Sequence, residues 1–91
     1  MKVQQMTNGR GNKVANQFII FDSEFTAFQS YDSVIVKTTF EDGKRVVYLD
    51  ETYWDYSRTT GKYRNMFLGE KKADTQRKID SGEYALTNLN D

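Results

Sequence analysis

Apolar residues in the first half of the chain follow spacings that are typical of strands. Phe18 to Phe21 is a short, β-prone apolar run, and after a polar turn the aromatic-rich segment from Phe25 to Tyr31 follows. These two segments predict a hairpin. Val34 to Phe40 is rich in β-branched residues, whose stiff side chains suit a pleated sheet. We therefore expect a third strand there.

A second hairpin is predicted between Val34 to Phe40 and Arg45 to Leu49. The pair Asp42-Gly43 lies between these runs, and Asp-Gly favours a type I′ turn because both central residues need positive φ. Consecutive strands with short links form antiparallel sheets, and the buried face of such a sheet needs a cover. The chain thus predicts a meander of three to four antiparallel strands.

The second half of the chain changes to helical spacing. Thr60 to Leu68 carries its apolar residues three and four apart, Ser57 or a neighbouring threonine can cap the first turn, and Gly69 can end the helix. Lys72 to Ser81 predicts a second, largely exposed helix. Glu83 to Leu89 follows as either an edge strand or an irregular segment. The stretch from Tyr53 to Gly69 joins the two halves and is the chemically richest part of the chain.

Together these elements predict an α+β fold in which two short helices pack on one face of the meander. Residues 1–16 are polar and rich in Gly and Asn, which indicates a flexible basic arm ahead of a single α+β domain over residues 17–91. At 91 residues the chain has room for one core.

Composition narrows the classes of function. Cysteine and histidine are absent, which removes thiolate chemistry, the commonest general base and the commonest metal ligand. We therefore expect a protein that is not an enzyme and has neither a cofactor nor a metal site. No apolar run reaches the roughly 20 residues of a membrane span and no signal-peptide core is evident, so we expect a cytoplasmic protein without a membrane partner.

The net charge is zero, but the charges are unevenly distributed. Residues 1–16 have three bases and no acid, residues 17–56 have eight acids against three bases, and residues 57–91 have seven bases against five acids. Such a distribution predicts a bipolar molecule, although an ordinary surface of mixed charge can have the same uneven distribution along the sequence.

One segment has the composition of an anion-binding site. Arg58, Lys62 and Arg64 occur together, and no acid lies between Asp55 and Glu70. At the start of a helix, free backbone amides and hydroxyls can hold phosphate, and neighbouring tyrosines can stack on bases. Alternatively the hydroxyls cap the helix, Tyr63 fills the core and the bases are solvated. The candidate residues for nucleic-acid or anion binding are Ser57, Arg58, Thr59, Thr60, Lys62, Tyr63, Arg64 and Asn65.

A resemblance rests on part of the same segment. Its motif is Ser57-x-Thr59-Thr60-x-Lys62-Tyr63-x-Asn65-x-Phe67-Leu68, preceded by Phe28-Gln29-Ser30-Tyr31 and Val34-Ile35-Val36. This pattern resembles a family of small uncharacterised single-domain proteins of bacteriophages and other mobile elements. The resemblance implies such an origin, in a bacterial host, more than a mechanism.

Two functions of different classes follow. The first is a small binding protein that holds nucleic acid through the basic, hydroxyl-rich helix start. The second is a protein interaction factor that inhibits a host enzyme or defence system through an acidic sheet surface. That surface would comprise Asp22, Glu24, Asp32, Asp50 and Asp55. The oligomeric state stays open, and no proline protects an edge strand from pairing with a second copy.

Overall fold

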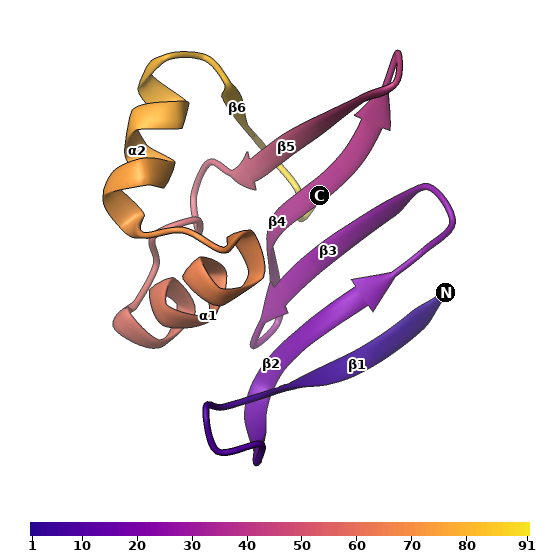
Figure 1. Ribbon diagram of the computed structural model, residues 1–91, viewed down its shortest axis with the longest axis vertical. Coiled ribbons are helices and arrows are strands. Elements are labelled where there is room, and N and C mark those ends of the chain that lie inside the picture. Colours follow the sequence, from indigo (N-terminus) through magenta and orange to yellow (C-terminus); the bar gives the residue numbers. More distant parts are fainter.

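A single six-stranded sheet, with two helices on one face, forms the protein (Figure 1). The computed structural model describes all residues, 1–91. The strands lie in the sheet in chain order. They are β1 (Lys2–Thr7), β2 (Lys13–Phe21), β3 (Phe25–Ser30), β4 (Ser33–Glu41), β5 (Lys44–Asp50) and β6 (Tyr84–Thr87).

The expected α+β class is correct, but the expected antiparallel meander of three to four strands is wrong. Strands β1 to β5 are antiparallel, whereas β6 pairs with β5 in parallel. A parallel partner requires a crossover connection, and the two helices provide it between β5 and β6. The sheet is therefore mixed and larger than the local pattern predicted.

The N-terminal segment is also not the flexible arm that we expected. Residues 1–16 form β1 and the first part of β2, paired from Lys2 opposite Phe21 to Thr7 opposite Lys13. The side chain of Asn8 closes the hairpin loop by accepting hydrogen bonds from the backbone amides of Arg10 and Asn12, at 2.9 and 3.1 Å. The glycines lie only in this loop, so their freedom does not disturb the strands.

The local turn and helix signals are confirmed. Asp42 and Gly43 have φ of 54° and 79° in the turn between β4 and β5. Helix α1 (Arg58–Leu68) begins after Ser57, whose Oγ accepts a hydrogen bond from the Thr60 amide at 3.1 Å. It ends at Gly69, which has φ of 71°. Helix α2 (Lys72–Asp80) follows at once.

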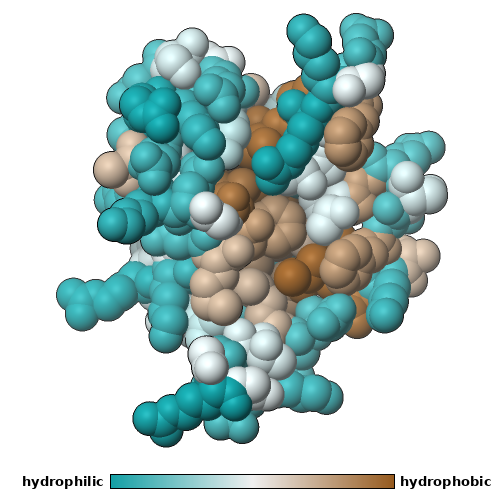
Figure 2. Space-filling model, viewed as in Figure 1, coloured by the Kyte–Doolittle hydropathy of each residue, from teal (hydrophilic) through white to brown (hydrophobic).

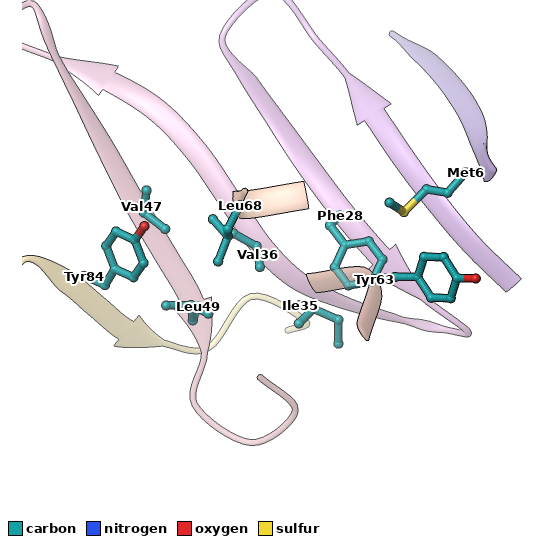
Figure 3. Close-up of a cluster of buried hydrophobic side chains, with 9 residues drawn as sticks. All are labelled: Met6, Phe28, Ile35, Val36, Val47, Leu49, Tyr63, Leu68 and Tyr84. Carbon is teal, nitrogen blue, oxygen red and sulfur yellow. The ribbon is translucent and has the colours of Figure 1, made fainter. Parts of the chain in front are cut away.

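The core lies between the helices and the sheet (Figure 3). Strand residues of the central sheet contact Tyr63 and Leu68 from α1, and the ring of Phe28 stacks on that of Phe67 with centroids 6.0 Å apart. The buried cluster comprises Met6, Phe28, Ile35, Val36, Val47, Leu49, Tyr63, Leu68 and Tyr84. Apolar side chains also reach the surface between the helices and the first strands (Figure 2), where Met6, Ile19, Phe21, Met66 and Phe67 line a groove.

Helix α1 is attached to the sheet at the turn between β3 and β4. The hydroxyls of Ser30, the last residue of β3, and Thr60 lie 2.9 Å apart, and both residues are buried. The antiparallel register brings the β1–β2 loop, the β3–β4 turn and the β5–α1 loop to the same end of the sheet (Figure 1). The start of α1 therefore lies at this end of the sheet, beside the β3–β4 turn. Neither helix combines the length and apolar character that crossing a membrane would require.

Candidate nucleic-acid interface

A hollow without any hydrophobic residue in its lining lies beside the first half of α1. Its volume is about 740 Å³. It contains four basic side chains and one carboxylate, so its lining has an excess of positive charge. We call it the basic hollow, and its lining residues are Asp55, Ser57, Arg58, Gly61, Lys62, Arg64, Asn65 and Lys72.

Arg58 and Lys62 are the available cations of the basic hollow. Both are exposed, neither makes a salt bridge, and they lie four residues apart on the same face of α1. Lys62 approaches only the ring of Tyr63, with its Nζ 5.5 Å from the ring centroid. Both side chains are therefore accessible to solvent, and anion binding by them stays a prediction.

Arg64 has a different role from the phosphate contact that we expected. It is 1% exposed, and its Nη1 donates hydrogen bonds to the Trp54 carbonyl at 2.7 Å and to Asp55 Oδ1 at 3.3 Å. Its Nη2 donates to Asn65 Oδ1 at 3.0 Å, and the guanidinium lies 5.2 Å from the Trp54 ring centroid. Arg64 thus holds the β5–α1 loop against the helix, because its position in α1 points its side chain inward.

Asp55 is the only carboxylate of the basic hollow and is neutralised by two cations. Its Oδ1 pairs with Arg64 and its Oδ2 lies 2.6 Å from Lys72 Nζ. Burial raises the pKa of Asp55, but the hydrogen bonds and charges of Lys72 and Arg64 outweigh that effect and lower the pKa overall. Asp55 therefore stays ionised, and its two ion pairs, rather than any loss of charge, limit its repulsion of an incoming anion.

The other predicted site residues divide between surface and interior. Thr59 is exposed beside the capping residue Ser57, whereas Thr60 is buried and its hydroxyl bonds to Ser30 and Ser57. Tyr63 is 5% exposed within the core. Its ring is therefore not available for stacking on a base, and the alternative interpretation of a core residue is correct for this position.

A second hollow, which we call the aromatic hollow, lies on the other side of Ser57. Its volume is about 550 Å³, and it is lined by Ser30, Tyr31, Asp32, Ser33, Ile35, Tyr53, Tyr56, Ser57 and Thr59. Tyr31 and Tyr56 are 47% and 64% exposed, and the Tyr53 and Tyr56 rings meet edge to face with centroids 5.6 Å apart. Tyr31 was missed at the sequence level, since only the β3–β4 turn brings it to α1.

The loop that carries Tyr53 and Tyr56 is held by Asp50. This carboxylate is buried, and it accepts hydrogen bonds from the amides of Thr52, Tyr53 and Leu89 at 3.1, 2.9 and 2.9 Å. Burial raises the pKa of Asp50, but these hydrogen bonds outweigh it, so the pKa lies below its usual value. The aromatic hollow is therefore built on a tightly bonded loop.

The acidic surface that we expected does not form. Asp50 is buried and Asp55 is paired with two cations, while Asp22 and Glu24 lie at the opposite end of the sheet from Asp32. The alternation of turns in an antiparallel sheet separates Asp22 and Glu24 from Asp32, whereas the burial of Asp50 and the pairing of Asp55 depend on packing that local sequence does not show.

The chain matches, over residues 1–83, the model of a family of unknown function, DUF8033. It belongs to this family. The match extends from β1 to the end of α2 and includes every residue that lines the two hollows of this DUF8033 protein. Comparison with curated proteins and with solved structures gives no match.

Proposed function

We propose that this protein is a non-enzymatic binding protein whose ligand is a nucleic acid, held at the start of α1. The observation that supports this proposal is the pair of exposed, unpaired cations Arg58 and Lys62 in a hollow whose single carboxylate is neutralised and whose lining includes no hydrophobic residue. Phosphate oxygens accept the hydrogen bonds that such a surface offers.

Arg58 and Lys62 are the phosphate contacts in this proposal. They are exposed and unpaired, and they lie in the first half of α1, where the helix dipole also favours negative charge. The hydroxyl of Thr59 adds a donor at the same helix start. Arg64 contributes by holding the loop, and Lys72 contributes part of its charge through the pair with Asp55.

The distribution of charge over the sheet favours a long polyanion over a single phosphate group. Arg10 and Lys13, in and beside the β1–β2 loop, lie at the same end of the sheet as the start of α1 (Figure 1). The carboxylates of the β2–β3 and β4–β5 turns lie at the other end, and they are Asp22, Glu24, Glu41 and Asp42. Lys44 and Arg45 lie beside these carboxylates and offset part of their charge, so the first end is the more positive of the two and would attract a polymer of phosphates more strongly.

Titration with labelled single-stranded DNA, duplex DNA and RNA at two salt concentrations tests the proposal. The informative variant is Arg58→Ala/Lys62→Ala, and Lys44→Ala/Arg45→Ala is the control because it removes equal charge from the exposed β4–β5 hairpin. We expect salt-sensitive binding that the first variant loses and the control retains. The slope of the logarithm of the binding constant against the logarithm of the salt concentration should become shallower by about one for each phosphate contact removed.

Absence of binding to every nucleic acid at low salt would reject the proposal. Equal loss in both variants would reject the basic hollow as the site, since it would show that only the net charge matters. Origin in a bacteriophage or mobile element, which the resemblance implies, stays a prediction, and so does inhibition of a host protein.

A further inference from the structure

We propose that the aromatic hollow binds an unpaired base, so that the ligand of this site is single-stranded nucleic acid. The inference rests on the function proposed above, because it needs the neighbouring phosphate to occupy the basic hollow. It adds that the ligand is single-stranded, and that the basic hollow receives a phosphate while the aromatic hollow receives a base.

The two hollows meet at the first turn of α1. Ser57 lines both of them, while the next residue, Arg58, lines the basic hollow and the following one, Thr59, lines the aromatic hollow. One turn of helix therefore separates a phosphate-binding surface from an aromatic one. This arrangement corresponds to that of a nucleotide, whose charged phosphate and flat base extend in different directions from the sugar.

The tyrosines of the aromatic hollow are suited to stacking. Tyr31 and Tyr56 expose 47% and 64% of their surface, far more than a core aromatic residue such as Tyr63 at 5%. Tyr53 braces the ring of Tyr56 by an edge-to-face contact, and the Asp50 carboxylate holds the Tyr53 amide. The rings are thus presented by an ordered loop, which lowers the entropic cost of stacking on a base.

The polar groups of this hollow favour a base over a phosphate. Asp32 is exposed on its wall and makes no salt bridge, so its carboxylate would repel a phosphate group. The same carboxylate can accept hydrogen bonds from an exocyclic amino group, as acidic side chains do with cytosine. Thymine has no such group. We therefore expect cytosine or adenine to be preferred over thymine at this position.

A base can enter the hollow only if it is unpaired. In a duplex both faces of each base are stacked on neighbours, so neither face is open to a tyrosine ring, although one hydrogen of each amino group stays accessible in the major groove. Duplex DNA could still contact Arg58 and Lys62 through its phosphates, but it would leave the aromatic hollow empty. The inference therefore predicts tighter binding of a single strand than of a duplex of equal length.

Fluorescence anisotropy with oligo-dC, oligo-dT and a duplex of equal length tests the inference on the full chain. We expect oligo-dC to bind most tightly, with oligo-dT weaker. Tyr56→Ala should weaken single-strand binding about tenfold and leave duplex binding unchanged, because only the stacking contact is lost. Tyr56→Phe keeps the ring and should retain affinity.

Two further variants complete the design. Asp32→Ala should remove the preference for oligo-dC over oligo-dT. Phe40→Ala removes another exposed aromatic side chain, 73% exposed on β4 near the opposite end of the sheet, and should change nothing. The comparison of oligonucleotides on the unmodified protein needs no variant, so a folding defect in any one variant leaves the test decisive.

The outcomes separate this inference from the proposed function. Salt-sensitive binding that is lost in Arg58→Ala/Lys62→Ala, yet equal for single strand and duplex and insensitive to Tyr56→Ala, would overturn the inference and leave the proposed function standing. Absence of binding to any polyanion would overturn both.

Discussion

The side chain of Asn90 makes with Val34 the pair of hydrogen bonds that a neighbouring strand would make. The Val34 amide donates to Asn90 Oδ1 at 2.7 Å, and Asn90 Nδ2 donates to the Val34 carbonyl at 3.0 Å. The pairing of β4 with β5 begins only at Val36, so Val34 lies beyond the ladder. Asn90, in the segment that follows β6, therefore completes the sheet beside Ser33 and Ile35, which line the aromatic hollow.

Asn90→Ala is expected to destabilise the fold by about 1 kcal/mol, because the backbone groups of Val34 lose both partners. Asn90→Asp replaces the donor by an acceptor that faces the Val34 carbonyl and adds a charge beside Asp50, so its effect should be at least as large. Urea unfolding of the three proteins measures the difference. Equal stability of Asn90→Ala and the parent chain would show that water replaces the side chain at no cost.

Arg64 and Arg58 should behave in opposite ways. Arg64→Ala leaves the Trp54 carbonyl and Asp55 without their buried partner and should cost about 3 kcal/mol of stability. Arg64→Lys should not restore it, since a lysine cannot reproduce the planar set of donors. Arg58→Ala, at an exposed position, should stay within about 0.5 kcal/mol of the parent protein. Thermal or urea unfolding checks both expectations, and a destabilised Arg58→Ala would contradict them.

Glu70 connects α2 and β6 through a single carboxylate. Its Oε1 accepts hydrogen bonds from Lys78 Nζ and from the Tyr84 hydroxyl, both at 2.8 Å, and its Oε2 accepts one from the Thr75 hydroxyl. Glu70→Ala should therefore destabilise the protein by about 2 kcal/mol. Tyr84→Phe removes one donor only and should have a smaller effect. Comparable losses in the two variants would show that the Tyr84 hydrogen bond accounts for most of the effect.

Three carboxylates with lowered pKa values predict how the stability of the fold depends on pH. Burial raises the pKa of Asp50, Asp55 and Glu70, but hydrogen bonds and neighbouring cations outweigh it and lower all three in the folded protein. Unfolded carboxyl groups titrate near about pH 4. Their stabilising contribution is therefore complete above that pH and is lost as the pH falls toward the lower folded pKa values.

Urea unfolding at a series of pH values between 7 and about 3 measures this dependence. The free energy of unfolding should be nearly level above about pH 5 and fall below about pH 4. Asp50→Asn, which cannot titrate, should be less stable at neutral pH and show a shallower fall in acid. An identical fall in the variant would show that Asp50 does not contribute to acid sensitivity.

The N-terminal strand provides a test of the corrected architecture. Met6 on β1 is 6% exposed within the core, so Met6→Ala should cost about 2 kcal/mol. Val3, on the same strand, is 57% exposed, and Val3→Ala should have little effect. Calorimetry of both variants distinguishes a docked strand from a flexible arm, for which neither substitution would matter.

The elements that the sequence predicted correctly depend on neighbours in the chain. The Ser57 cap, the Gly69 end of α1 and the Asp42-Gly43 turn each satisfy backbone groups only a few residues away. Strand β6 remained ambiguous because it pairs with the distant strand β5, whereas β1 was missed although its partner β2 is its neighbour in the chain. The side chains of β1 are polar enough to resemble those of a loop.

For the candidate site, the sequence by itself determined which charges and hydroxyls stand at the start of α1, and Arg58 and Lys62 are exposed there as predicted. Only the tertiary structure decided that Arg64 and Tyr63 face inward and that Tyr31 joins the hollow from the β3–β4 turn. The physical reason is that a side chain's neighbours across a sheet and a helix are set by register and packing over the whole chain, which local sequence does not encode.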